Sequence, residues 1–320
     1  MDTADVVWTY PCNLSVLREA QGIIAHSENT LRLTKRWYGS SAVDNLDVIP
    51  LLRVPVLEHD RIKARDTLNL KPSDFVICSF GLLGASKLNH RLLESWLASD
   101  LAKDNNGILV FVGENQASEY GQELLTAIQH SGINKRIRIT GWVDTETFRD
   151  YLSAADVAVQ LRTRSRGETS AAVLDCMNYG LPTIVNANGS MADLADDAVW
   201  KLTDEFSNEE LVKAIEGLWG DRLKRSQIGK RAREIILDKH APRSCADQYF
   251  EAIENFYRNA ITNIHSLTDA ISKIDLAPVN SNELLLLAEN IAKSIRPTLA
   301  PRQLLIDISE LVQHDSKSGI

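Results

Sequence analysis

The chain has 320 residues, enough for about two domains of ordinary size. Its hydrophobic content of 44% and charged content of 24% are typical of a globular protein, and no apolar run approaches the roughly 20 residues that span a bilayer. The net charge of −8 argues against a general nucleic-acid-binding protein, which would normally carry a basic surface.

Four cysteines are dispersed along the chain: Cys12, Cys78, Cys176 and Cys245. They form no CxxC pair, and the opening segment has no pattern typical of a secretory leader. We therefore expect reduced thiols and a cytoplasmic location, rather than a disulfide framework or a zinc site.

Short apolar runs alternate with longer amphipathic segments through the first two thirds of the sequence. The predicted strands are residues 22–27, 46–55, 74–81, 107–113, 136–143, 156–162 and 182–188. The predicted helices between them are residues 28–38, 90–102, 118–131, 144–155 and 170–179. Continuously apolar strands that alternate with helices predict a parallel sheet covered on both faces, which is a doubly wound α/β domain. Ligands of such sheets bind outside the carboxyl ends of the strands.

After Ala198 the sequence is predicted to be helical, with helices at residues 208–219, 222–239 and 243–261. The stretch "NSNELLLLAENIAKSI" predicts a further helix capped at Ser281, and residues 302–312 read as a new strand. We expect four parts, which are residues 1–55 as the remnant of an N-terminal domain, 56–261 as a nucleotide-binding domain with C-terminal helices, 262–300 as a linker with a helix, and 301–320 as the start of a following module.

The segment "LRTRSRGETSAAVLDCMNYGLPTIVNANG" places Glu168 and Asp175 on one helical face, separated by about 10.5 Å of rise if both are helical. Two carboxylates at that spacing can accept hydrogen bonds from the hydroxyls at both ends of a nucleoside diphosphate sugar. Thr169 and Ser170 stand at the predicted helix start, where N–H groups favour a phosphate. Alternatively, Ser170 or Thr169 is merely the N-cap of this helix, and Asp175 is a solvated helix residue.

A second candidate is "SFGLLGASKLN", residues 79–89, directly after a predicted strand. Gly81 and Gly84 would let the backbone approach a ligand, and Lys87 offers a compact positive charge for a diphosphate. The pattern is neither a dinucleotide fingerprint nor a P-loop. Alternatively, it is an ordinary strand-to-helix turn with an exposed lysine.

Three arginines, Arg162, Arg164 and Arg166, would point to one side of an extended segment and could face a phosphate or an anionic acceptor. A solvated loop is the alternative for at least two of them. His26 could line a cleft or be a hydrogen-bonded structural histidine. No metal-ligand spacing stands out, so we expect no metal.

The motifs "FGLLGASK", "VFVGEN", "RITGWVD", "ADVAVQLR" and "GETSAAVLDCMNYGLPTIV" together resemble the retaining glycosyltransferases of family 4, which have the GT-B fold. The front segment "GIIAHSENTLRLTKRWYG" resembles the last βαβ unit of that family's N-terminal domain. Three positions depart from the pattern. Leu82 replaces an arginine, Asp175 replaces the longer glutamate, and Gly167 stands where the first acid is expected, one residue before Glu168.

The end of the chain, "RQLLIDISELVQHDSKSGI", is similar to the opening of another glycosyltransferase module in bacterial O-antigen-type polysaccharide enzymes. The resemblance thus implies adjacent glycosyltransferase modules as partners, and a chain that lacks most of its acceptor-binding domain. Such a chain is expected to bind nucleotide but to transfer little sugar by itself.

By this resemblance the protein transfers a hexose, mannose from GDP-mannose in the first instance, from a GDP- or UDP-linked sugar to a glycan or lipid-linked glycan with retention of configuration. It would act without a metal or other cofactor, in the cytoplasm or at the inner face of the membrane. The implied catalytic residues are Glu168 and Lys87. The implied donor-binding residues are Gly81, Gly84, Lys87, Trp142, Val143, Arg166, Thr169, Ser170 and Asp175, with Trp142 and Val143 flanking the nucleobase.

Two other functions fit the same fold. A sugar-nucleotide epimerase would need catalytic acids of its own, and none is placed for that reaction. A non-catalytic nucleotide-sugar-binding module of a larger synthase is favoured by Leu82 and by the shifted position of Glu168.

Overall fold

The computed structural model describes residues 14–259, 271–273 and 280–294. The chain divides into two compact units, residues 1–251 and 252–320. Among the described residues, no helix combines the length and the apolar character that a membrane crossing needs.

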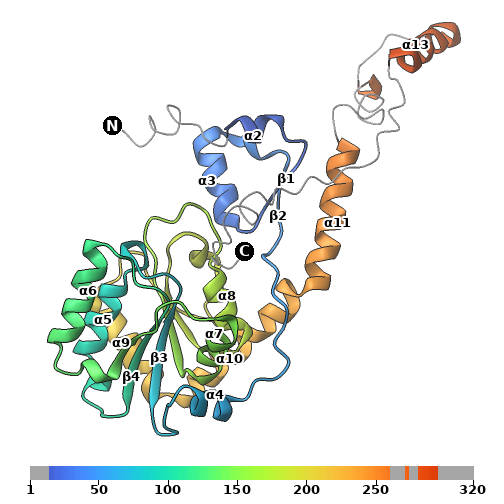
Figure 1. Ribbon diagram of the computed structural model, residues 1–320. Helices are drawn as coiled ribbons and strands as arrows, with labels where there is room; N and C mark the ends of the chain where they lie inside the picture. Colours follow the sequence, from blue (N-terminus) through green and yellow to red (C-terminus); the bar gives the residue numbers. More distant parts are fainter. Residues whose placement is uncertain (1–13, 260–270, 274–279, 295–320) are drawn as a thin grey trace. The chain divides into compact units, whose positions relative to one another are not determined.

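The main sheet has six parallel strands in the order β5-β4-β3-β6-β7-β8, and Figure 1 labels β3 and β4 among them. They are β3 (Phe75–Phe80), β4 (Gly107–Val112), β5 (Ile137–Ile139), β6 (Val157–Gln160), β7 (Thr183–Asn186) and β8 (Trp200–Leu202). Every residue of β4, β6 and β7 is buried, as expected for strands covered on both faces. The predicted doubly wound α/β fold is confirmed.

Helices cover both faces of this sheet. Helices α5 (Asn89–Ala98), α6 (Glu119–His130) and α9 (Asn208–Gly220) pack on one face, around a core that includes Trp96, Phe111 and Leu211. The other face is covered by α4 (Arg61–Thr67), α7 (Thr145–Ala154), α8 (Ala171–Asn178) and α10 (Arg222–Ile235). Burial of the apolar side chains between these layers is the main stabilising contribution.

The strand order changes direction at β3. From β3 the chain builds β4 and β5 on one side, and it then returns to build β6, β7 and β8 on the other. The loops after β3 and β6 therefore leave adjacent strands in opposite directions. In open parallel sheets this topological switch point is where a ligand-binding crevice forms at the carboxyl ends of the strands.

The N-terminal part is a separate two-stranded parallel sheet, β1 (Ile23–Ala25) and β2 (Leu46–Val48), joined by α3 (Glu28–Tyr38) and preceded by α2 (Leu14–Glu19). Ser27 caps α3 by accepting a hydrogen bond from the Thr30 N–H at 3.1 Å. The strand–helix–strand unit predicted for this segment is confirmed. Residues 49–60, here called the connector, lead from β2 to α4 without regular secondary structure.

The structure corrects the sequence prediction at several places. The strand predicted at residues 46–55 ends at Val48, and the rest of that range belongs to the connector. Strand β8 lies in a region predicted to be helical, because three residues are too few to give an apolar pattern. Helix α4 was not predicted, since only Ala64 and Arg65 of its seven residues are buried. The helix α13 (Ser281–Ser294) is capped by Asn280, whose Oδ1 accepts from the N–H groups of Asn282 and Glu283, and not by Ser281.

The remaining C-terminal helices follow the prediction. Helix α10 continues into a π-helical turn, Ile236–His240, and α11 spans Pro242–Asn259. The strand predicted at residues 302–312 lies outside the described residues.

Candidate functional site

The turn after β3 lies at the switch point of the sheet. Gly81 has a φ of +104°, a conformation that side chains disfavour, and a Cβ placed there would have no heavy atom within 4 Å. Gly84 is instead extended and faces the side chain of Gln116, and its N–H donates to Asn89 Oδ1 at 3.0 Å. The turn therefore has open space beside Gly81 and is fixed at Gly84.

The turn after β3 is joined to the loop after β6. The N–H of Thr163 donates to the carbonyl of Ser86 at 2.9 Å. This contact brings Lys87, from the first loop, into the electrostatic range of Arg162 and Glu168, from the second. Residues that are distant in the sequence therefore form one cluster across the switch point.

Lys87 is the partly buried centre of that cluster. Burial, together with the neighbouring charge of Arg162, lowers the pKa of Lys87 to about 8, while Glu168 acts in the opposite direction. Within the described residues its ammonium group makes no hydrogen bond or ion pair. A partly desolvated cation of this kind can bind an anion such as a phosphate strongly. The alternative of an exposed turn lysine is wrong.

Glu168 lies in the loop just before α8. Its carboxylate forms an ion pair with Arg162 and accepts hydrogen bonds from the Arg166 N–H at 2.7 Å and from Ser165 Oγ at 3.3 Å. Burial by itself raises the pKa of Glu168. The hydrogen bonds from backbone N–H groups and the charge of Arg162 outweigh burial, so the pKa of Glu168 lies below its usual value.

The three arginines do not share one side of an extended segment. Arg164 has a φ of +57°, so the backbone turns there. The side chain of Arg162 forms an ion pair with Glu168, whereas Arg166 lines, together with Glu168, a cavity on the side of the N-terminal part. Of the three arginine side chains, that of Arg162 is the one that forms an ion pair with Glu168 among the described residues.

Asn186, Asn188 and Asp204 form a polar network that sequence analysis missed. Asn186 bridges the loop after β6, with its Oδ1 accepting from the Arg162 N–H and its Nδ2 donating to the Arg162 carbonyl, both at 2.8 Å. Both asparagine side chains also donate to the Asp204 carboxylate. The polar run "NANGS" at the end of a predicted strand was the signal that could have identified the two asparagines.

Thr169 and Ser170 precede the first residue of α8. The side chain of Ser170 is buried and makes no capping hydrogen bond, and the Thr169 hydroxyl donates to the His26 carbonyl at 2.8 Å. Ser170 thus occupies the N-cap position of α8, as the alternative interpretation of this segment has it, but its side chain makes no capping hydrogen bond. No side-chain hydrogen bond from Ser170 competes for the first N–H groups of α8.

Asp175 lies on α8 and faces the connector. Its Oδ1 is 2.8 Å from Nε of Arg53, and its side chain keeps 31% exposure. Burial raises the pKa of Asp175, and the charge of Arg53 offsets this only in part. The alternative of a fully solvated helix residue does not hold.

Trp142 and Val143 follow β5, which β4 separates from β3. The Trp142 side chain is 55% exposed, while Val143 packs against the core beneath the sheet. These two residues share the carboxyl edge with Lys87 but lie two strands away from it. Their predicted role beside a nucleobase remains a prediction.

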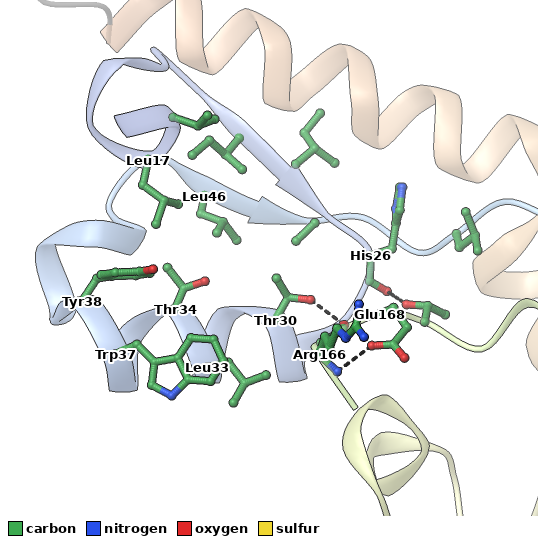
Figure 2. Close-up of a pocket in the computed structure, with 17 residues that line it drawn as sticks. Leu17, His26, Thr30, Leu33, Thr34, Trp37, Tyr38, Leu46, Arg166 and Glu168 are labelled. Carbon is green, nitrogen blue, oxygen red and sulfur yellow. Dashed lines mark hydrogen bonds between the residues drawn. The ribbon is translucent and has the colours of Figure 1, made fainter. Parts of the chain in front are cut away.

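A cavity of about 550 Å³ adjoins the Glu168 loop on the side of the N-terminal part. Figure 2 shows its apolar side chains on α2, α3, β1 and β2, and Arg166 and Glu168 at one end. At that end the hydroxyls of Ser27 and Thr30 both donate to the Gly167 carbonyl at 2.7 Å. His26 lines this cavity and is also hydrogen-bonded through Nδ1 to the Ile49 carbonyl at 2.9 Å, so both interpretations of it apply.

Within the described part of the chain, no three or more His, Cys, Asp or Glu side chains are grouped so that they could hold a metal ion. The residues that the structure brings together are Lys87, Arg162 and Glu168 at the switch point. Asp175 forms a second polar pair, with Arg53, further along the same segment.

Several solved structures share the fold of this chain. HepE from Anabaena, solved in complex with UDP-glucose, is 18% identical with a TM-score of 0.66, and the match covers 79% of this chain and 68% of HepE. WaaG, a glycosyltransferase involved in lipopolysaccharide biosynthesis, is 14% identical with a TM-score of 0.61, over 70% of this chain and 60% of WaaG. The chain thus spans only part of the length of both proteins.

The C-terminal domain of the group 1 glycosyl transferase LpcC from Francisella tularensis is also similar, with 18% identity and a TM-score of 0.52 over 59% of this chain and 96% of that domain. A search of curated proteins gives no match. Residues 60–235, which hold the six-stranded sheet and Lys87, Glu168 and Asp175, match the family described as glycosyl transferases group 1. These residues make up more than half of the chain, and the protein therefore belongs to the group 1 glycosyl transferases, with a GT-B type α/β fold.

Proposed function

We propose that this chain binds a nucleotide sugar at the carboxyl edge of its six-stranded sheet and takes part in transferring the hexose, with retention, to a growing polysaccharide. The observation that carries the proposal is Lys87, a partly buried cation without a partner among the described residues. It lies at the switch point within electrostatic range of Arg162, in the same turn as Gly81, which has open space beside it. A diphosphate would supply the negative charge that pairs with the ammonium group of Lys87.

Departure of the sugar leaves negative charge on the diphosphate. In this proposal Lys87 and Arg162 stabilise that charge, together with the first N–H groups of α8 beside Thr169 and Ser170. Preorganised donors are most effective where charge develops in the transition state. The reaction then needs no metal or other cofactor.

The remaining roles extend along the same edge. Asp175 accepts hydrogen bonds from ribose hydroxyls, and Trp142 and Val143 flank the nucleobase. Glu168 faces the donor sugar near its anomeric carbon, and Arg166 lies beside it. Gly81 and Gly84 shape the turn that lets the diphosphate approach the backbone.

The donor in this proposal is GDP-mannose or a UDP-linked hexose. GDP-mannose follows from the family resemblance, whereas HepE is a structural relative solved with UDP-glucose. The acceptor is a glycan or a lipid-linked glycan, supplied with the help of adjacent glycosyltransferase modules.

A non-catalytic nucleotide-sugar-binding module is the second candidate. It is favoured by the ion pairs that occupy both acids, Glu168 with Arg162 and Asp175 with Arg53. If those pairs persist when the donor is bound, the chain would hold the nucleotide sugar without assisting its cleavage.

Calorimetry with UDP, GDP, UDP-glucose and GDP-mannose tests the proposal. A ligand present at 100 times its Kd should also stabilise the chain against thermal unfolding by about 2.7 kcal/mol. Absence of binding by all four ligands would contradict both candidate functions. Binding without release of nucleoside diphosphate, in the presence of glycan acceptors and the adjacent modules, would favour the second.

A further inference from the structure

The connector is held against the donor-binding part by polar contacts with α8. The side chain of Asn178 is buried and makes two hydrogen bonds to the connector backbone. Its Nδ2 donates to the Val54 carbonyl at 2.9 Å, and its Oδ1 accepts from the Val56 N–H at 3.1 Å. Such paired hydrogen bonds fix both the position and the register of this segment on the helix.

His240 holds the connector at Leu51 and Arg53, just before the residues that Asn178 contacts. Its Nδ1 lies 2.8 Å from the Leu51 carbonyl, which can only accept, so the ring nitrogen is the donor. Its backbone carbonyl accepts from the Arg53 N–H at 2.7 Å. The backbone of Arg53 is therefore fixed between the His240 contacts and the Asn178 pair.

From this fixed backbone, the side chain of Arg53 reaches Asp175. Its Nε lies 2.8 Å from Asp175 Oδ1, and the arginine side chain keeps only 15% exposure. The more exposed carboxylate keeps an accessible surface that a ligand can reach. An arginine this buried, beside an acid that is itself partly buried, affects that acid much more than a surface ion pair would.

We propose that Arg53 is a positioning residue for the donor site: its guanidinium group lies against Asp175 and orients the carboxylate so that it can accept hydrogen bonds from ribose hydroxyls. This inference rests on the proposed function, since it takes Asp175 as a nucleotide-binding residue. It adds a residue from outside the six-stranded sheet to the machinery, and it makes nucleotide affinity depend on the placement of the connector.

The charge of Asp175 depends on the groups around it. Arg53 faces it from the connector, Tyr179 and Cys176 are neighbours on α8, and His240 faces Arg53 from the π-helical turn. Burial raises the pKa of Asp175, and Arg53 is the group that lowers it. Without Arg53, protonation of Asp175 should begin at a higher pH.

The test measures Kd values for UDP and GDP by calorimetry from pH 5 to pH 8, in wild type, Arg53→Met, Arg53→Lys and Asp175→Asn. We expect Arg53→Met to weaken binding by about tenfold at neutral pH, as for the loss of one charge-assisted contact, and to shift the acid-side loss of affinity to higher pH. Arg53→Lys should restore most of the affinity. Arg32→Met is the matched control, because Arg32 lies on α3 and forms an exposed ion pair with Asp193 rather than with Asp175.

The double variant Arg53→Met/Asp175→Asn separates an effect through Asp175 from a general effect on the fold. If Arg53 acts through Asp175, the double variant binds no more weakly than Asp175→Asn alone. Should Arg53→Met not fold, Arg53→Gln serves in its place and keeps a polar group in the site.

Three outcomes would overturn the inference while leaving the proposed function intact. In the first, Arg53→Met has the affinity and pH profile of wild type although Asp175→Asn binds weakly. In the second, Arg53→Met binds more tightly than wild type. In the third, the losses of affinity from the two single variants add up in the double variant. If wild type binds neither nucleotide, the proposed function fails and the inference with it. If Asp175→Asn binds as wild type, Asp175 has no role in binding and the inference alone fails.

Discussion

Glu168 and Asp175 come from the same short segment but lie in contrasting environments. Glu168 lies in a loop, its side chain is 44% exposed, and it is surrounded by N–H donors and Arg162. These donors keep its pKa below the usual value despite some burial. Asp175, on the helix, has Arg53 as its only ion-pair partner among the described residues, and burial raises its pKa.

At Glu168 the backbone hydrogen bonds and the charge of Arg162 together outweigh burial, whereas at Asp175 burial outweighs the charge of Arg53. Glu168 is prepared as a carboxylate beside Lys87, where the proposed chemistry takes place. At Asp175, the charge of Arg53 from the connector opposes the rise in pKa that burial causes. We therefore expect changes at Glu168 to act mainly on turnover and changes at Asp175 to act mainly on affinity.

The largest expected effect follows from Glu168→Gln, which keeps the shape of the side chain and removes its charge. We expect kcat to fall on the order of 100-fold while the Kd for nucleoside diphosphate changes little, because the carboxylate assists only as charge develops. Release of nucleoside diphosphate from the donor, with acceptor and adjacent modules present, gives kcat. A variant with wild-type kcat would remove Glu168 from the reaction and would shift attention to Arg164 and Arg166.

Lys87→Ala should weaken binding of UDP or GDP by about 10- to 100-fold, the value of a lost charge-assisted contact of ~1.5–3 kcal/mol. Binding of the bare nucleoside should be nearly unchanged, because in the proposed binding mode Lys87 contacts only the diphosphate. Asp175→Ala is the contrasting variant and should weaken both ligands alike through the ribose. Equal losses for nucleoside and diphosphate in Lys87→Ala would place the lysine outside the phosphate site.

A smaller effect is expected from pH. Because the pKa of Lys87 is lowered to about 8, its charged form is lost as the pH rises above that value. Affinity for the diphosphate should then decline, by at most about tenfold for each further pH unit, while the affinity for the nucleoside stays constant. Lys87→Arg keeps its charge and should bind independently of pH in this range. A wild-type affinity that is flat from pH 7 to pH 10 would contradict this assignment.

The smallest expected effect is on stability in acid. Since the folded protein holds the pKa of Glu168 below its ordinary value of 4.5, the stabilisation from this carboxylate is present above that pH. It is lost as the pH falls through the lower folded pKa. Wild type should exceed Glu168→Gln in stability at pH 7 by less than about 1 kcal/mol, because the pair is exposed, and the difference should vanish in acid. Chemical unfolding at several pH values measures this difference in stability. A difference that persists or grows in acid would contradict the lowered pKa of Glu168.

Much of the fold could be predicted because its signals are local. The helix predicted after "GIIAHS" spans the observed residues of α3, and the helix predicted at 118–131 differs from α6 only at its capping residues. Continuous apolar runs predicted the parallel sheet, since only strands buried on both faces are apolar throughout. The short elements α4 and β8 were missed, because each has too few buried residues to produce a recognisable apolar pattern in the sequence.

For the site, the sequence by itself determined which residue types were available and at which strand ends they stand. It placed Gly81 and Lys87 after one strand, and Glu168 and Asp175 after another, because the carboxyl ends of parallel strands share one edge. Only the tertiary structure decided which of these meet. The hydrogen bond between the loops after β3 and β6 joins Lys87 to Arg162 and Glu168. The fixed backbone of the connector places Arg53 against Asp175. A local sequence pattern cannot predict such contacts, because the contacting segments lie far apart in the chain.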